Sequence, residues 1–262
     1  MAVHNPEFNL DFRKRLRAAE LDRVIPLLPP GCRVLEVGAG AGWQARELNS
    51  RGFSVVAIDI NTSVYRDVQE WEIIEYDGRR IPLPDGSIDV VFSSNVLEHV
   101  PDVVDFMREM ERVLAPGGFM VHVMPTTTWR FFTTLSFYLY RAKVIGLRLL
   151  GVKKSKSKEG TAGTSSNFET GPIKRGFFAK LLLPTLHGVR GNVFSEHYYF
   201  SAHFWRGVFE KGGQTIAKEL SAGYFYTGYK VLGAVFPLSL RSAAAALLGP
   251  SCRVYVTEKK PQ

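Results

Sequence analysis

The 262-residue sequence predicts an α/β fold built on a doubly wound, mostly parallel sheet. Between residues 31 and 125, short apolar runs alternate with segments of helical spacing, and such runs are typical of strands buried on both faces. The first run passes directly into three glycines and then into a helical segment. A strand, a glycine loop and a helix in succession form the nucleotide-binding corner of open α/β sheets, so the sequence predicts a nucleotide-like ligand.

Residues 1–30 are predicted to form a helical cap before the sheet begins. Apolar side chains recur there at roughly helical spacing, with arginines between them: Phe12, Leu16, Ala19, Val24 and Leu27. We expect this helix to pack over the ligand cleft in a structural role.

The glycine loop follows a predicted strand at residues 34–37. Gly38, Gly40 and Gly42 are spaced G-x-G-x-G, whereas the dinucleotide fingerprint G-x-G-x-x-G serves a pyrophosphate. Glu36 stands two positions before the first glycine, and a carboxylate there suits a ligand with a cationic group. The sulfonium and ammonium of S-adenosylmethionine are such groups. A glycine turn without any ligand is the alternative.

Two acids close the next predicted strands. Residues 54–58 end in Asp59, which is placed to accept hydrogen bonds from ribose hydroxyls or, alternatively, to cap a helix or turn. A short strand at 73–76 is closed by Asp77 and Gly78, and an acid there can accept a hydrogen bond from an adenine amino group.

The core continues with a fourth strand at 90–94, a core-facing helix at 102–114 and a fifth strand at 119–124. The motif L-E-H-V-P occupies residues 97–101, and L-x-P-G-G occupies 114–118 as the turn into the fifth strand.

These motifs resemble the class I S-adenosylmethionine-dependent methyltransferases, in the methyltransferase type 11 or UbiE-like subgroup, from about Arg33 to Pro125. The resemblance implies a Rossmann-like sheet whose final strand is antiparallel, S-adenosylmethionine as cofactor, and methyl transfer as the activity. It implies that Glu36 and the glycines hold the amino acid end, Asp59 the ribose, and Asp77 and Gly78 the adenine, with Asn95 beside the methionine moiety. The full set of implied cofactor-binding residues is Glu36, Gly38, Ala39, Gly40, Gly42, Asp59, Ile60, Asp77, Gly78, Asn95 and Val96.

Charge is concentrated in one predicted insertion, residues 126–195. Residues 129–190 contain twelve Lys or Arg and two acids, so the rest of the chain carries −2 of the net +8. Residues 129–150 are apolar and aromatic, and a lysine-rich run follows at 153–158. Apolar residues beside a polybasic cluster are typical of a segment that lies on an anionic membrane. A cap helix with a solvated loop is the alternative.

The remainder, residues 196–262, is predicted to complete a single methyltransferase domain over 1–262, whose cofactor-binding core is 31–125. Strands at 214–220 and 253–257 resemble the antiparallel pair that ends the class I sheet. An apolar insertion, 223–250, separates them; Lys230, Pro237 and Arg241 interrupt it, so a membrane-spanning helix is not expected.

His99 and His197 are the candidate catalytic residues. A hydroxyl acceptor must lose its proton, and histidine is a common base for that step. Related ubiquinone O-methyltransferases carry a metal-holding Glu-His pair, but Asn95 replaces their upstream acid, so no metal is predicted. Each histidine has a plain structural role as its alternative.

The predicted function is methyl transfer to a small-molecule, saccharide or lipid-linked acceptor, on oxygen with carbon as the alternative. No base-reading motif is visible, which disfavours nucleic acid. The alternatives are an RNA or protein methyltransferase that uses the basic insertion, and a non-catalytic cofactor-binding interaction protein. The N-terminus lacks the pattern of a secretory signal, which predicts a cytoplasmic protein. If the basic insertion lies on an anionic membrane, the protein is peripheral at the inner membrane face. The oligomeric state is not predicted.

Overall fold

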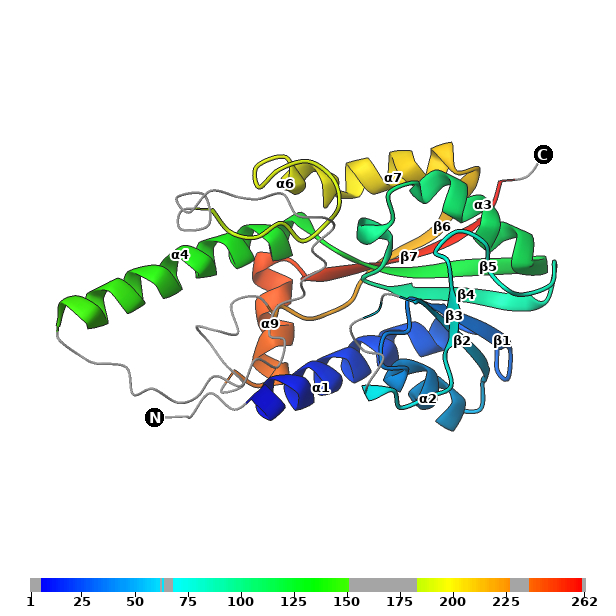
Figure 1. The fold of residues 1–262 in the computed structure, drawn as a ribbon, viewed down its shortest axis with the longest axis horizontal. Coiled ribbons are helices and arrows are strands. Elements are labelled where there is room, and N and C mark those ends of the chain that lie inside the picture. Colours follow the sequence, from blue (N-terminus) through cyan, green and yellow to red (C-terminus); the bar gives the residue numbers. More distant parts are fainter. Residues whose placement is uncertain (1–5, 62, 64–67, 151–182, 227–235, 261–262) are drawn as a thin grey trace.

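The computed structural model describes residues 6–61, 63, 68–150, 183–226 and 236–260. Within them, seven strands form one sheet in the order β3-β2-β1-β4-β5-β7-β6 (Figure 1). The strands are β1 (Arg33–Val37), β2 (Ser54–Ile60), β3 (Ile74–Tyr76), β4 (Ile88–Ser94), β5 (Leu114–Pro125), β6 (Gln214–Ser221) and β7 (Cys252–Lys259). The helices are α1 (Pro6–Val24), α2 (Trp43–Ser50), α3 (Val103–Val113), α4 (Thr127–Leu149), α6 (Glu196–Tyr199), α7 (Ala202–Lys211) and α9 (Leu238–Leu248), with single 3₁₀ turns η1 (Ile25–Leu27) and η3 (Leu97–His99).

The strand directions confirm the predicted sheet. Strands β1 to β5 pair in parallel, whereas β7 is antiparallel to both of its neighbours, β5 and β6. Strand β1 lies between β2 and β4. Strands β2 and β3 extend the sheet on one side of β1, and β4, β5, β7 and β6 extend it on the other, so the strand order reverses at β1. In such sheets the crevice for a ligand lies beyond the carboxyl ends of the strands at this reversal.

The core has two apolar layers because successive side chains of a strand point to opposite faces. Val34 of β1 packs in the layer beneath α1 and α2, and its neighbour Leu35 packs in the layer beneath α3 and α7. Val90 and Val91 of β4 divide in the same way. Figure 1 shows these helix pairs on the two sides of the sheet. Helix α1, the predicted N-terminal cap, is therefore part of the core.

Strand β5 begins five residues earlier than the predicted start at Phe119. Leu114 pairs with Ile88, the register then shifts, and Phe119 pairs with Val90. The Pro-Gly-Gly residues between them form the irregular part, where Gly117 has a φ of 80°. The turn motif thus lies inside a paired strand, because extended backbone on both sides of it meets β4.

The predicted insertions begin with helices. In Figure 1, α4 extends from the end of β5 away from the sheet, and α9 lies near its base. The lysine-rich run at 153–158 lies outside the described residues. Among the described helices, none combines the length and hydropathy needed to cross a membrane.

Candidate active site at the carboxyl ends of β1 and β4

The glycine loop leaves β1 in a conformation that side chains disfavour. Gly38, Gly40 and Gly42 have φ values of 70°, 60° and 76°. A Cβ at Gly38 would lie 2.5 Å from a methyl carbon of Val96, and one at Gly42 would lie 2.6 Å from the Cβ of Trp71. The amides of Gly38 and Ala39 both donate to the carbonyl of Ile58, at 2.9 and 3.0 Å. Both the backbone conformation and the close approach of neighbours therefore require glycine at Gly38 and Gly42.

Asp59 ties this loop to β2. Its Oδ2 accepts hydrogen bonds from the Gly40 amide at 2.8 Å and from the Ser63 hydroxyl at 2.9 Å. Its Oδ1 accepts from the Ile60 amide at 2.8 Å. Ile60 pairs with Tyr76 at the end of β3, and a Cβ on Gly78 would approach Ile60 to 3.3 Å. The residues predicted for the ribose and adenine thus converge beside the glycine loop.

Glu36 is buried at the end of β1 with 2% of its surface exposed. Its Oε2 has no hydrogen-bond partner among the described residues. Burial raises the pKa of this carboxyl to about 8, against a hydrogen bond from the Ala45 amide that lowers it. A buried acceptor without a partner is costly, and a ligand that donates to it removes that cost. This orphan oxygen fits the amino or hydroxyl donors of S-adenosylmethionine.

Asp77 forms a turn in this structure. Its Oδ1 accepts hydrogen bonds from the amides of Arg80 at 2.9 Å and Arg79 at 2.8 Å, and these bonds lower the pKa of the carboxyl. The predicted contact with adenine is compatible with this arrangement, since the same side chain has a second oxygen.

Asn95 occupies a left-handed conformation at the end of β4, with a φ of 56°. Its amide donates to the Val123 carbonyl at 2.8 Å. In the side-chain orientation that satisfies both amide atoms, its oxygen accepts from Arg17 of α1 at 2.8 Å. Asn95 therefore joins the helical cap to the strand end where the methionine moiety is predicted.

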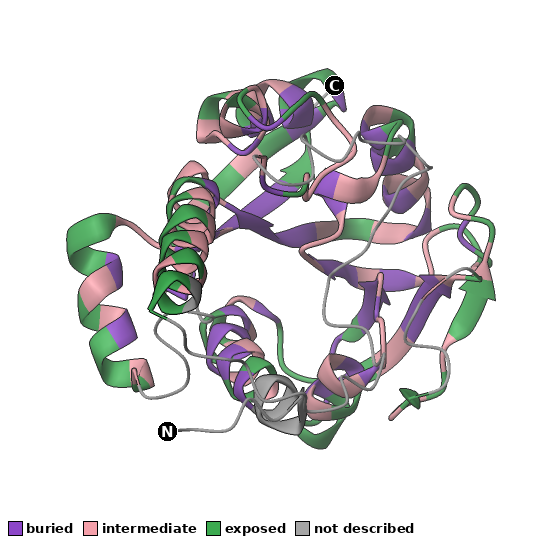
Figure 2. Cartoon of the chain, turned by 60° about the vertical axis from the view of Figure 1, so that its left-hand side comes forward, coloured by how far each residue is buried: buried purple, intermediate pink, exposed green. Residues whose placement is uncertain are grey.

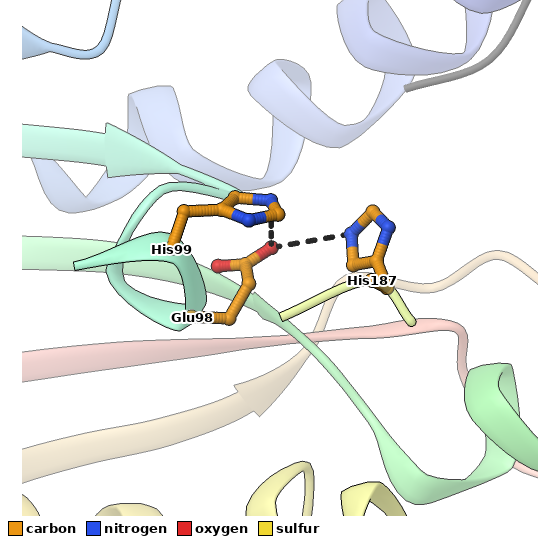
Figure 3. Close-up of side chains that lie close together, drawn as sticks. All are labelled: Glu98, His99 and His187. Carbon is orange, nitrogen blue, oxygen red and sulfur yellow. Dashed lines mark ion pairs between the residues drawn. The ribbon is translucent and has the colours of Figure 1, made fainter. Parts of the chain in front are cut away.

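Glu98 and His99, in the turn after β4, form an acid–histidine cluster with His187 from the segment before α6 (Figure 3). Glu98 Oε1 lies 3.7 Å from His99 Nε2 and 3.6 Å from His187 Nε2. The Glu98 side chain is 2% exposed, that of His99 8% and that of His187 18%. Burial lowers the pKa of His99 to about 4, against the opposing charge of Glu98. Burial opposes ionisation of Glu98, but the two imidazoles lower its pKa below the ordinary value.

Sequence reasoning missed His187, because no motif surrounds it and it stands far along the chain from His99. Buried long-range contacts, rather than a sequence motif, position His187. Arg130 of α4 forms an ion pair with Glu196 at 2.8 Å and donates to the Thr185 carbonyl at 3.1 Å. Glu196 also accepts from the amides of His187 and Gly188, at 2.7 and 2.9 Å. These bonds fix the backbone that presents His187 to the cluster.

Arg190 holds the other side of the cluster. Its guanidinium donates to the carbonyls of four consecutive or nearly consecutive residues around η3: Leu97, Glu98, Val100 and Pro101. These hydrogen bonds of Arg190 connect the segment after the insertion to the turn that carries Glu98 and His99.

His197 lies outside the cluster. It stands in α6, where its carbonyl accepts from the Thr127 hydroxyl at 2.9 Å and its ring centroid lies 6.5 Å from that of Phe131. Burial lowers its pKa. The structure therefore brings one of the two predicted catalytic histidines, His99, together with further titratable groups.

Comparison with known proteins agrees with this geometry. Residues 35–122 match the family model described as a methyltransferase domain. Over 102 residues the chain is 37% identical to 2-methyl-6-phytyl-1,4-hydroquinone methyltransferase of a Synechocystis species, which covers 36% of this chain and 32% of that protein. Over 110 residues it is 36% identical to 27-O-demethylrifamycin SV methyltransferase of Amycolatopsis mediterranei, covering 37% and 40%.

The chain spans less than half the length of the curated relatives it matches. A solved structure of a SAM-dependent methyltransferase from Thermotoga maritima aligns over 97% of both chains, with a TM-score of 0.52 and 16% identity, and supports the fold alone. Taken with the glycine loop and the buried acid beside it, the match shows that residues 35–122 are similar to the methyltransferase domain of class I S-adenosylmethionine-dependent enzymes.

Proposed function

We propose that the protein transfers the methyl group of S-adenosylmethionine to an oxygen of a small-molecule, saccharide or lipid-linked acceptor. The observation that carries the proposal is the glycine loop with buried Glu36 at the carboxyl end of β1, whose Oε2 has no hydrogen-bond partner among the described residues. The names of two relatives, a phytyl hydroquinone methyltransferase and a demethylrifamycin methyltransferase, support a small organic acceptor.

The cofactor contacts in this proposal are those implied by the family resemblance. Glu36 and the loop amides receive the amino acid end, Asp59 the ribose hydroxyls, and Asp77 with Gly78 the adenine. Methyl transfer is an in-line displacement: the acceptor oxygen forms a bond to the methyl carbon, and the carbon–sulfur bond breaks with its electron pair left on sulfur. Positioning and exclusion of water supply much of the rate in such a step.

The acceptor hydroxyl must also lose its proton. We place this task at the acid–histidine cluster, since His99 follows β4 and faces Glu98 within 3.7 Å. His197 is the second candidate, on the neighbouring helix α6. Loss of methyl transfer in His99→Ala with full activity in His197→Ala supports this placement, and the reverse pattern overturns it.

The decisive test supplies methyl-labelled S-adenosylmethionine and the protein to a cell extract, then separates lipid, saccharide, RNA and protein fractions. Label in a small molecule, a saccharide or a lipid supports the proposal. Label in RNA or protein overturns it in favour of a macromolecular acceptor. Binding of the cofactor without any transfer of label overturns it in favour of a non-catalytic cofactor-binding protein.

We further propose that α4 and α9 bring the protein to an anionic membrane surface. Exposed apolar residues of α4 recur at intervals of four, three, seven and four residues, which places them in one stripe: Phe131, Leu135, Tyr138, Ile145 and Leu149. Helix α9 adds exposed Leu240, Leu247 and Leu248. Figure 2 shows exposed residues along these helices.

Positive charge accompanies this apolar stripe. Lys143 of α4 is exposed, and the four lysines within residues 153–158 follow the helix in sequence. Each basic residue near an anionic surface contributes on the order of 1 kcal/mol, and each apolar side chain that leaves water contributes roughly 1.5–3 kcal/mol. Together these terms are sufficient for reversible membrane binding.

Vesicle sedimentation tests this surface. We expect binding to phosphatidylcholine vesicles that contain phosphatidylglycerol, with loss of binding at high salt. The Leu135→Glu/Ile145→Glu variant is expected to bind at least tenfold more weakly, whereas Leu220→Glu, an exposed position on β6, is the matched control. Equal binding to pure phosphatidylcholine, or a salt-independent dimer with no vesicle binding, overturns the membrane proposal and leaves methyl transfer standing.

A further inference from the structure

One oxygen of Glu98 lies between two imidazoles that come from distant parts of the chain (Figure 3). Its Oε1 is 3.7 Å from Nε2 of His99, in the same turn, and 3.6 Å from Nε2 of His187, before α6. A charge-assisted N–H···O bond has a length of about 2.8 Å, so a movement of less than about 1 Å at each gap connects the three groups in series. Contacts of this kind are often long in a site without its substrate and tighten when the substrate binds.

The three groups differ in their access to water. Glu98 and His99 are enclosed, whereas the side chain of His187 is 18% exposed. The ring of His187 packs against Trp129 of α4, with centroids 4.5 Å apart, and against Phe200, with centroids 6.0 Å apart. These contacts fix the ring at the outer end of the series. A proton that reaches His187 therefore exchanges with water, whereas a proton on His99 lacks that access.

The inner two groups hold a proton with similar strength. Burial lowers the pKa of His99 to about 4, Glu98 opposes this shift, and the charges of His187 and Arg190 add to it. Burial raises the pKa of Glu98, but the two imidazoles bring it below the ordinary value of 4.5. A proton therefore passes between His99 and Glu98 at little cost. A weak base is sufficient here, because a hydroxyl becomes strongly acidic while its oxygen bonds to the methyl carbon.

We propose that Glu98 and His187 form a proton relay that carries the proton of the acceptor from His99 to water. The relay rests on the proposed methyl transfer to oxygen. As the oxygen–methyl bond forms, the acceptor proton moves to Nδ1 of His99, and the proton on its Nε2 moves to Oε1 of Glu98. Glu98 passes a proton to Nε2 of His187, which releases one from Nδ1 to water. Each group regains its starting charge, and proton exchange between turnovers restores the two tautomers.

Nuclear magnetic resonance tests the coupling of these groups without any methyl acceptor. The full chain carries isotope-labelled histidine, and the ring nitrogens of His99 are followed over the pH range in which circular dichroism shows a folded protein. Because the charge of His187 lowers the pKa of His99, His187→Ala is expected to raise it; Glu98→Gln is expected to lower it, by roughly 1 in each case. His203→Ala, at an exposed position of α7, leaves it unchanged.

Chemical rescue separates a relay from a purely structural role. Transfer of label from methyl-labelled S-adenosylmethionine to the cell extract is expected to fall roughly tenfold or more in His187→Ala, and imidazole added to the buffer should restore part of it. Calorimetry with S-adenosylmethionine shows whether the variant is folded, and His203→Ala keeps the wild-type rate with or without imidazole.

Two results overturn the relay. One is a titration of His99 that neither His187→Ala nor Glu98→Gln changes. The other is a folded His187→Ala that transfers label at the wild-type rate, or whose loss imidazole does not restore. A wild-type chain that transfers no label counts against the proposed function, and the titration then decides by itself whether the three groups are coupled.

Discussion

Replacing Glu36 by glutamine is expected to stabilise the cofactor-free protein and to weaken its binding of S-adenosylmethionine. Burial raises the pKa of the Glu36 carboxyl to about 8, against the opposing hydrogen bond from the Ala45 amide. At pH 7 the folded protein therefore holds this group protonated, whereas the unfolded chain, with a pKa of 4.5, releases the proton. Folding at neutral pH thus requires proton uptake.

The magnitude follows from the pKa difference. A folded-state pKa above the unfolded one leaves stability intact below pH 4.5 and removes it progressively as the pH rises to about 8. Each pH unit in that window costs about 1.4 kcal/mol, so the penalty is about 3 kcal/mol at pH 7 and less than about 1 kcal/mol at pH 5. Glutamine is close in shape to the protonated acid and does not ionise, so it removes this penalty. The free energy of unfolding of Glu36→Gln should therefore exceed that of the wild type by about 3 kcal/mol at pH 7 and by less than about 1 kcal/mol at pH 5.

Urea unfolding of the wild type and Glu36→Gln at pH 5 and pH 7 measures the free energy of unfolding of each protein. A packing difference between glutamate and glutamine is the same at both pH values, so the change in the stability difference between pH 5 and pH 7 reports the pKa effect. Glu210→Gln, at an exposed position of α7, is the control and should show no such dependence. An equal gain for Glu36→Gln at both pH values, or a loss at pH 7, would refute the pKa argument.

Cofactor binding supplies the other half of this prediction. If the Glu36 carboxylate receives the donors of S-adenosylmethionine, the wild type must release its proton on binding at pH 7. Calorimetry in buffers of different ionisation enthalpy should detect that proton for the wild type and not for the variant. Loss of a charge-assisted hydrogen bond should weaken binding by roughly tenfold to a hundredfold. Unchanged affinity would remove Glu36 from the cofactor site.

Two further changes test the framework of the site. Gly38→Ala places a Cβ 2.5 Å from Val96 at a φ of 70°, so cofactor binding measured by calorimetry should fall at least tenfold, while Gly52→Ala, which meets no neighbouring atom, keeps affinity. Arg130→Met leaves Glu196 buried without its ion pair and should cost about 3–5 kcal/mol in urea unfolding, and adding Glu196→Gln should recover most of the loss. A double variant no more stable than Arg130→Met alone would show that the pair does not act as a unit.

The sheet and the cofactor loop could be predicted because their determinants are local. Neighbouring residues of a strand, such as Val34 and Leu35, point to opposite core layers, and this follows from the sequence alone. The positive φ of Gly38 is a conformation that glycine adopts readily, so the residue type predicts it. The resemblance then placed Asp59 at the loop, and its hydrogen bond to the Gly40 amide is consistent with that position.

The cluster around Glu98 could not be predicted in full because its determinants are long-range. His187 reaches Glu98 across the whole insertion, and it is held there by the Arg130–Glu196 pair and by two backbone amides. None of these contacts leaves a periodic or spaced motif. The early start of β5 has a similar origin, because pairing with β4 extends a strand through residues that read as a turn.

The buried glutamates of the described residues differ in whether the fold supplies a charged partner. Glu196 has an arginine and two amides, so its burial is compensated within the fold. Glu20 is paired with Arg17, and Glu98 with His99 and His187. Glu36 has no such ion pair among the described residues, and its Oε2 accepts no hydrogen bond there. A fold under selection for stability alone would replace such groups, since an apolar residue or an amide costs less in the same place. The presence of Glu36 at the end of β1 is explained if its missing partner is a ligand, the cationic cofactor.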